Sequence, residues 1–233
     1  EHEGNDTSMS YHFDDAAGGY DTRNITIERE QGGKKKEFTM ELYGQPQYGW
    51  IVMTDDGHPY LYTEIQSEND WRTMEVFDLK GEEIRHVGTS NDSPHGALLN
   101  DPDGFYLTRR VDALGTYDAY RKFHVGESGM PVAENDVYTK VNVCDSKEDE
   151  AALVSTRELP VTMMEADGSE KEEKLPVGTK YYVRATDLEN FVDMELSDGR
   201  RCRLAVKKSD KGWGFEIDGV YEEDCFEFIP YAG

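Results

Sequence analysis

The sequence is poor in the residues and motifs that mark several large classes of protein. Its 233 residues include only three cysteines, and no two of them have the C-x-x-C spacing of zinc sites and thioredoxin-like centres. No apolar run approaches the ~20 residues needed to span a bilayer. There is no G-x-S-x-G, no S-x-x-K and no glycine-rich phosphate loop. The sequence therefore gives no support to a zinc ribbon, a membrane span or a nucleotide-binding fold.

Positive charge is also scarce. There are 25 lysines and arginines against 49 aspartates and glutamates, so the formal net charge is -24. Nucleic acids and anionic membranes both attract basic surfaces, and this chain would repel them. We expect no nucleic-acid partner, and we interpret the charge as a solvated acidic surface. A cationic partner or divalent cations are the alternative.

Residues that could support catalysis have no recognisable pattern. None of the six histidines has H-x-x-x-H or H-E-x-x-H spacing, although His58 and His95 are expected in loops. Cys144 could approach His124, but it borders a carboxylate run that disfavours a thiolate. We predict that the protein is not an enzyme. The alternative is a hydrolase that uses a carboxylate pair or a histidine-assembled metal site, because the fold alone sets such distances.

The sequence is rich in short segments that alternate apolar and polar residues. Segments such as 37–43 and 191–196 have the two-residue period of half-buried strands, and Asp, Gly and Asn turns separate them. Fourteen tyrosines, nine phenylalanines and three tryptophans argue against disorder. No stretch has a helical period over a useful length. The pattern predicts an all-β protein.

The order of these segments predicts three regions. Residues 1–22 are polar and glycine-rich, and we expect a flexible N-terminal tether there. Residues 23–148 are predicted to form an antiparallel β meander or sandwich, and residues 149–233 a small β-barrel. The boundary is placed at the charged run 145–150, which has no apolar anchor.

Residues 155–233 resemble a bacterial SH3-like barrel. The resemblance rests on the segment 175–179 (LPVGT), the hairpin turn Asp198-Gly199-Arg200 and the ending 226–231 (FEFIPY). The segment departs from the usual pattern at Gly212-Trp213, which follows an extra basic strand. The resemblance implies a binding module rather than a known reaction.

The whole chain also resembles uncharacterised lipoproteins of Gram-positive gut bacteria. This resemblance rests on the segments 114–117 (LGTY) and 229–233 (IPYAG). The first residues do not begin with Met and look like the polar tether that follows a removed export signal or a lipid-anchored cysteine. This resemblance implies a secreted protein at the extracellular cell surface, with a lipid anchor as one mode of attachment.

Aromatic residues are the main candidates for ligand binding. Aromatic faces near carboxylates stack on sugars or hold peptide segments, so the ligand is predicted to be a cell-wall glycan or a protein partner. The alternative is that these aromatics fill the β core. The predicted ligand-binding residues are Trp50, Trp71, Tyr60, Tyr62 and Trp213.

Two further features are candidates for calcium binding and for a disulfide. Asp101 and Asp103, in the segment 100–104, and the turn 55–58 have oxygen ligands spaced for Ca²⁺, although both are also ordinary turn sequences. A calcium-stabilised adhesion protein is therefore a further alternative function. Cys202 and Cys225 are predicted to form a disulfide if their strands are neighbours, or to be two buried free thiols.

Overall fold

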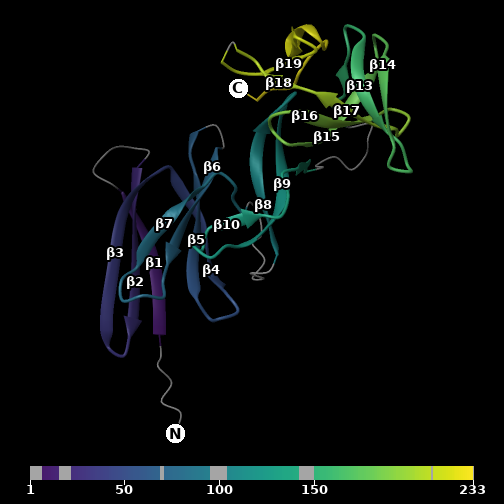
Figure 1. Ribbon diagram of the computed structural model, residues 1–233. Coiled ribbons are helices and arrows are strands. Elements are labelled where there is room, and N and C mark those ends of the chain that lie inside the picture. Colours follow the sequence, from purple (N-terminus) through teal and green to yellow (C-terminus); the bar gives the residue numbers. More distant parts are fainter. Residues whose placement is uncertain are drawn as a thin grey trace. The chain divides into compact units, whose positions relative to one another are not determined.

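The regular structure of this protein is almost entirely β-strand (Figure 1). The computed structural model describes residues 7–15, 22–68, 71–94, 104–141, 150–210 and 212–232. Within these ranges there is no α-helix, and a short 3-10 helix covers Glu222–Asp224. The predicted all-β class is confirmed. No helix in the described ranges is long and apolar enough to cross a membrane.

The chain divides into two compact units. Unit 1 comprises residues 1–109 and 122–134, and unit 2 comprises residues 110–121 and 135–233. The division differs from the single boundary predicted at the run 145–150, because strands β8 (Phe105–Asp112) and β9 (Thr116–Val125) each contribute residues to both units. Most of the charged run lies outside the described residues.

Unit 1 begins with a three-stranded antiparallel sheet in the order β1-β2-β3. Its strands are β1 (Thr7–Asp15), β2 (Thr22–Gln31) and β3 (Lys34–Tyr43). Gly32 and Gly33 close the β2–β3 hairpin with φ of 57° and 74°, values that glycine adopts without strain. Strand β1 covers residues 7–15 of the tether predicted for residues 1–22, and residues 1–6 and 16–21 lie outside the described ranges. Met9 and Phe13 alternate with polar residues there and pack against the core.

A second antiparallel sheet of unit 1 has the order β4-β5-β6-β7. Its strands are β4 (Gln45–Met53), β5 (Pro59–Gln66), β6 (Arg72–Asp78) and β7 (Arg85–Ser90). Residues 60–65 of β5 are all buried, so this strand is covered on both faces. Alternation along β5 sends Leu61 and Ile65 to one face and Tyr60 and Tyr62 to the other.

Each face of the second sheet has its own hydrophobic core. On one face, Leu61, Ile65 and Phe77 pack against Ile25 and Ile27 of the first sheet. On the other face, a second cluster includes Phe105 and Phe123 of β8 and β9. Its buried members are Val52, Tyr60, Tyr62, Met74, Val76, Phe105, Leu107 and Phe123. Unit 1 is therefore layered, with the β4–β7 sheet in the middle. Strand β10 (Pro131–Ala133) pairs with the end of β9.

Unit 2 is built on a larger antiparallel sheet. From the start of β9 the order is β11-β15-β16-β17-β13-β14, and β12 also pairs with β15. The strands are β11 (Tyr138–Lys140), β12 (Leu153–Val154), β13 (Leu159–Met164), β14 (Glu170–Leu175), β15 (Lys180–Thr186), β16 (Phe191–Leu196) and β17 (Arg201–Ala205). A second sheet has the order β18-β19-β20, with β18 (Lys207–Lys208), β19 (Phe215–Ile217) and β20 (Val220–Tyr221).

The sheets of unit 2 are open, whereas the sequence predicted a small closed barrel for residues 149–233. Strand β14 ends the larger sheet, and the three strands β18–β20 form a sheet of their own. The physical reason lies in β14, whose sequence EKEEKL is mostly exposed and charged. Charged side chains are typical of an edge strand and oppose pairing with a further strand. One core of buried alternate residues, among them Val192, Met194 and Leu204, fills the unit.

The loop between β9 and β10 covers the two buried tyrosines of β5. Gly129 in this loop has φ of 90°, and a Cβ there would lie 2.1 Å from Cε1 of Tyr60. Its carbonyl oxygen accepts a hydrogen bond of 2.6 Å from Tyr62 Oη. The loop can approach this closely only because the residue is glycine.

We expect Gly129→Ala to lower the free energy of unfolding by more than about 3 kcal/mol, because it adds both backbone strain and overpacking. Gly57→Ala is the matched control, since Gly57 has φ of 75° but nothing within 4 Å of a Cβ. It is expected to cost about 1–2 kcal/mol. Urea unfolding of both variants measures the difference, and equal losses would contradict the packing argument.

Candidate binding site

Two of the predicted ligand-binding residues belong to the core. Tyr60 and Tyr62 are 4% and 0% exposed, and both pack in the second core of unit 1. Burial raises the pKa of Tyr62, whose hydroxyl donates to the Gly129 carbonyl. The binding role predicted for these tyrosines does not carry over to the structure, because they offer no surface to a ligand. The sequence could not separate them from exposed aromatics, since β5 is buried on both faces.

The three tryptophans have different surroundings within their units. Trp50 is half-buried against the second core, with the Tyr48 ring at 5.8 Å. Trp71 is 43% exposed. Its backbone forms hydrogen bonds with two residues that line a cavity. The N–H of Trp71 donates to Glu68 O at 3.2 Å, and its carbonyl oxygen accepts from Ser67 N–H at 2.8 Å. Trp213 is 55% exposed and belongs to unit 2.

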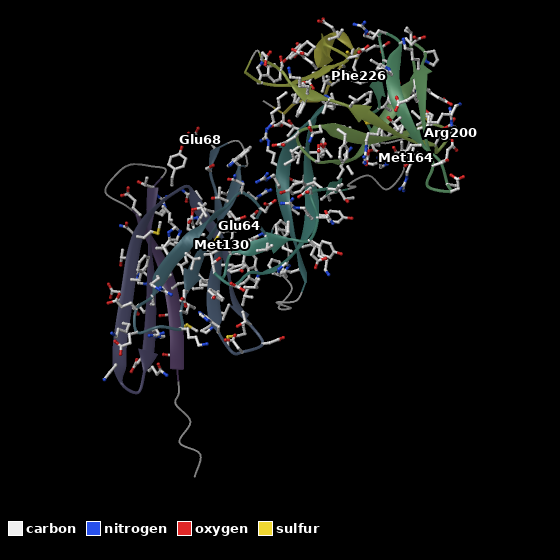
Figure 2. The ribbon with its side chains drawn as sticks, viewed as in Figure 1. Glu64, Glu68, Met130, Met164, Arg200 and Phe226 are labelled. Atoms are coloured by element: carbon white, nitrogen blue, oxygen red, sulfur yellow. The ribbon has the colours of Figure 1, made fainter. Side chains whose placement is uncertain are left out.

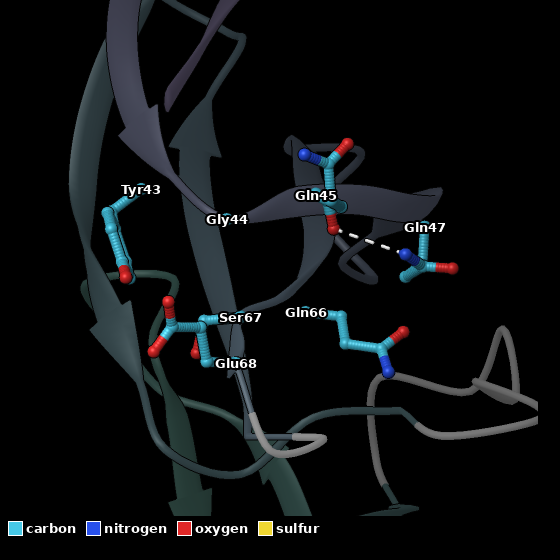
Figure 3. A pocket seen from close by; sticks show the side chains of 7 residues that line it. All are labelled: Tyr43, Gly44, Gln45, Gln47, Gln66, Ser67 and Glu68. Carbon is cyan, nitrogen blue, oxygen red and sulfur yellow. Dashed lines mark hydrogen bonds between the residues drawn. The ribbon is translucent and has the colours of Figure 1, made fainter. Parts of the chain in front are cut away.

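The cavity beside Trp71 has a volume of about 300 Å³ and lies in unit 1 (Figure 3). It is formed where β3 turns into β4 and where β5 ends. Its lining residues are Tyr43, Gly44, Gln45, Gln47, Gln66, Ser67 and Glu68. We call it the glutamine cavity.

Two backbone features build the glutamine cavity. Gly44 has φ of 110°, and a Cβ there would lie 2.7 Å from Gln66 O and 2.8 Å from Ile65 Cγ2. Only glycine lets the β3–β4 turn approach the end of β5 this closely. The β4–β5 register then shifts between Pro46 and Tyr48, which leaves Gln47 as an extra residue on β4. The bulge brings Gln47 to the cavity, where its Nε2 donates to Gln45 O at 3.3 Å.

The lining of this cavity suits an uncharged, hydrogen-bonding ligand. Each glutamine amide has two donor hydrogens and an acceptor oxygen. Figure 3 shows Tyr43 and Glu68 on one side and the three glutamines on the other. The Tyr43 ring is 58% exposed, so it can contact a ligand. Neither lysine nor arginine is among the lining residues, which disfavours phosphate and carboxylate groups.

Sequence reasoning missed these glutamines because they form no motif. Gln45 and Gln47 lie at the start of β4, whereas Gln66 lies at the end of β5, so their convergence depends on the β4–β5 pairing. The signals that could have indicated the site are Gly44 and Pro46, two residues that interrupt a strand pattern.

The histidine–carboxylate pairs of unit 1 resemble catalytic pairs only in composition. His86 Nε2 lies 2.7 Å from Glu75 Oε2, and Thr89 Oγ1 donates to the same oxygen at 2.8 Å. The threonine therefore bonds the carboxylate and not the imidazole, so the histidine is not placed to take a proton from it. His58 Nε2 lies 2.7 Å from Asp78 Oδ1, and its ring stacks on Tyr60 at 4.4 Å.

A buried carboxylate in β5 is closed to substrates. Glu64 is 1% exposed, and its Oε2 has no hydrogen-bond partner in the described residues. Figure 2 labels Glu64 among the side chains of unit 1. Pairing Tyr62 with Val76 and Glu64 with Met74 places Glu64 on the same face as the second core. A hydrolytic carboxylate pair would need access that this position does not have.

Of the two segments predicted as calcium candidates, the structure describes only one. The segment 55–58 forms a turn in which Gly57 N–H donates to Thr54 O at 2.8 Å, and Asp56 pairs with Lys80 at 3.2 Å. Asp101 and Asp103 lie outside the described residues, as do His95 and Cys144. Across the described ranges, no group of three or more His, Cys, Asp or Glu side chains is arranged to hold a metal ion.

Cys202 and Cys225 are both buried and free, so the predicted disulfide is not formed. Cys202 pairs with Met194 of β16 and Met163 of β13, and its thiol lies in the core of unit 2. Burial raises its pKa to about 12. This agrees with the second of the two alternatives, that of two buried thiols.

The two turns that carry the SH3-like resemblance line a cavity in unit 2. Its volume is about 390 Å³, and residues of both 175–180 and 196–200 line it. The charged groups of its rim are partly paired, since Arg200 Nε donates to Asp198 Oδ2 at 2.8 Å. The cavity thus has a mixed, partly neutralised lining and no distinct chemical preference.

An aromatic cluster in unit 2 covers a buried carboxylate. Trp213 lies edge-on to Tyr221 and Tyr231, with ring centroids 6.0 and 5.5 Å apart. Glu222 is 0% exposed, and its Oε1 accepts a hydrogen bond of 2.6 Å from Tyr231 Oη. Burial raises the pKa of Glu222, and the bond from Tyr231 offsets only part of that effect.

Comparisons with protein-family models, with curated proteins and with solved structures find no match. The geometry of the chain itself is therefore the basis for any statement about function.

Asp78 is expected to stabilise unit 1 in a pH-dependent way. Burial alone would raise its pKa, but hydrogen bonds from Lys80 N–H, His58 and Arg85 outweigh burial and lower it to about 2. The ionised group therefore stabilises the fold above its ordinary value of 3.8, and this contribution is lost as the pH falls towards 2. We expect Asp78→Asn to lower the free energy of unfolding by about 2 kcal/mol at neutral pH.

The measurement is urea unfolding of wild type and Asp78→Asn at neutral pH and near pH 2. The difference should disappear at the lower pH, and a constant difference would contradict the assignment. Asp56→Asn is the control, because Asp56 lies on the neighbouring turn but is exposed, and its replacement should change little.

The ionised carboxylate of Glu222 is expected to destabilise unit 2, whereas that of Asp78 stabilises unit 1. Since its pKa is raised in the folded state, ionisation destabilises the fold as the pH rises above its ordinary value of 4.5. We expect Glu222→Gln to raise the free energy of unfolding at neutral pH, and to have no effect near pH 4, where the carboxyl is protonated in both states. The exposed neighbour Glu223→Gln is the control. Thermal melts across pH measure both, and a gain that is independent of pH would refute the burial argument.

Proposed function

We propose that this protein is a non-catalytic binding module that acts outside the cell, at a bacterial surface, and holds a neutral sugar unit of a glycan in the glutamine cavity. The observation that carries the proposal is the lining of that cavity: three amides, an exposed tyrosine ring and one carboxylate, with no cation among them. A cell-wall glycan is the ligand class that this lining favours.

The chemistry of sugars matches these side chains. Sugar hydroxyls both donate and accept hydrogen bonds, and glutamine amides and Glu68 can satisfy both roles. The exposed ring of Tyr43 offers an apolar face to the C–H surface of a sugar. The volume of about 300 Å³ lies at the lower end of ligand pockets, which suits a single ring of a longer chain.

The rest of the chain is compatible with a passive binding role. His58 and His86 are bonded to carboxylates within the fold, and Glu64 is buried in the core. The net charge of -24 keeps the module soluble and repels anionic polymers. A secreted location and a lipid anchor belong to the proposal through the resemblance of the sequence, and no contact in the structure bears on them.

A protein partner is the second candidate, and the cluster of Trp213, Tyr221 and Tyr231 favours it. Exposed tryptophan and tyrosine side chains are enriched at protein interfaces, and Trp213 is 55% exposed above this cluster. This surface belongs to unit 2, whereas the glutamine cavity belongs to unit 1. The two candidates can therefore be tested by separate substitutions.

Glycan binding is tested with insoluble peptidoglycan and with a panel of neutral oligosaccharides. We expect Gln47→Ala and Tyr43→Ala each to weaken binding at least tenfold, or about 1.4 kcal/mol, because each removes a contact in the cavity. Tyr106→Ala is the matched control, since Tyr106 is a 49% exposed tyrosine of unit 1 that does not line this cavity. Isothermal titration with the soluble sugars gives the affinities.

Three outcomes would overturn the proposal. Retention that survives both cavity substitutions would move the site elsewhere. Loss of binding in Trp213→Ala alone would place the binding site at the aromatic cluster of unit 2. Release of reducing ends from the glycan would show a hydrolase. A rise in the melting temperature with millimolar Ca²⁺ would instead support the calcium-stabilised alternative, because a ligand of the folded state must stabilise it.

A further inference from the structure

A second cavity of unit 1 has a basic lining in a protein whose overall charge is strongly negative. Its volume is about 400 Å³, and it lies where the β2–β3 hairpin meets the turn after β6. The lining residues are Arg29, Gln31, Lys34, Lys36, Lys80, Gly81 and Glu82. Four of the chain's 25 lysines and arginines meet there with a single carboxylate. We call it the basic cavity.

The strand register sorts charge between the two faces of the hairpin. Arg29 is opposite Lys36, and Gln31 is opposite Lys34, so all four lie on the face that carries Ile25 and Ile27 further along β2. The other face carries the intervening residues of both strands. Those residues are Glu28, Glu30, Lys35 and Glu37.

This sorting leaves the outer cation paired and the inner cations unpaired. Lys35 Nζ lies 2.5 Å from Glu28 Oε1 on the outer face. On the inner face, no described carboxylate lies within ion-pair distance of Arg29, Lys34 or Lys36, although Lys80 pairs with Asp56 at 3.2 Å. The inner face of the hairpin therefore has a positive charge that the surrounding acidic surface does not neutralise.

Arg29 anchors this charge in the fold. It is 7% exposed, and its guanidinium donates to the carbonyl oxygens of Leu79 and Gly81. Carbonyls satisfy its hydrogen bonds but do not cancel its charge. A buried cation without a carboxylate partner is costly in a folded protein, and an anion in the neighbouring cavity lowers that cost.

We propose that the basic cavity binds a small ligand through a phosphate group. Three lysines surround the space with compact ammonium charges, which bind phosphate as point charges, and the buried Arg29 adds to the field. A multiply charged oxyanion matches the positive charge of Arg29, Lys34 and Lys36, which exceeds the single negative charge of Glu82 even though Lys80 is paired with Asp56. A long polyanion does not fit, because the remainder of the chain repels it.

This proposal is independent of the glycan proposal. The two cavities share no lining residue, and their linings have opposite chemical preferences, with amides in one and cations in the other. Substitutions in one cavity leave the side chains of the other in place.

The test uses the run of three lysines, which contains its own control. Inorganic phosphate is titrated at constant ionic strength, with sodium chloride as the balancing salt, while the melting temperature is recorded. We expect a saturable rise in wild type and in Lys35→Gln, whose lysine lies on the outer face. The double variant Lys34→Gln/Lys36→Gln is expected to lose at least tenfold in phosphate affinity.

Both exposed lysines can be replaced without touching the core, so the double variant is expected to fold, and its melting curve without phosphate verifies this. Either of two results would overturn the proposal: the absence of a saturable rise in wild type, or an equal rise in the double variant. Parallel titrations with glycerol 3-phosphate and a sugar 6-phosphate identify the source of the group. Tighter binding of an ester indicates a phosphorylated metabolite or polymer unit, and tighter binding of inorganic phosphate indicates the free ion.

Discussion

The burial of β5 on both faces is the constraint on which unit 1 depends. Leu61 and Ile65 pack against the first sheet, while Tyr60 and Tyr62 pack against β8 and β9, so one strand joins two cores. Such a strand has no solvent face, and its polar groups need internal partners. Tyr62 finds one in the carbonyl of Gly129, and the loop that supplies it closes over the tyrosine rings. The layers of unit 1 follow from this arrangement.

Both cavities of unit 1 lie at the ends of its packed layers, where the strands extend beyond the hydrophobic core. At one end Gly44 and the bulge at Gln47 bring amides together. At the other, the inner face of the β2–β3 hairpin changes from Ile25 and Ile27 to Arg29 beyond the core. Polar residues that continue an inward-facing row have no core to enter, so they line open space and are available to a ligand.

The distribution of charge supports a division between structural and binding groups. In unit 2, Glu150 accepts hydrogen bonds of 2.8 Å from both Lys140 and Arg184, and Arg203 bonds Asp193 through two nitrogens. Positive charge is scarce in this chain, and these three cations of unit 2 each have a carboxylate partner close by. Arg29, Lys34 and Lys36 differ from these in that they line one cavity with no described carboxylate within ion-pair distance, and this grouping carries information about function.

The sequence by itself determined the class of structure and many of its strands, because a two-residue period of apolar side chains forms a strand in any antiparallel sheet. It also indicated the β2–β3 hairpin through Gly32 and Gly33. It did not separate Tyr60 and Tyr62 from exposed aromatics, because a strand buried on both faces has no polar alternation. Only the tertiary structure decided which of Lys34, Lys35 and Lys36 face inward and where Gln45, Gln47 and Gln66 meet. Those outcomes depend on strand register, which joins residues that are distant in the sequence.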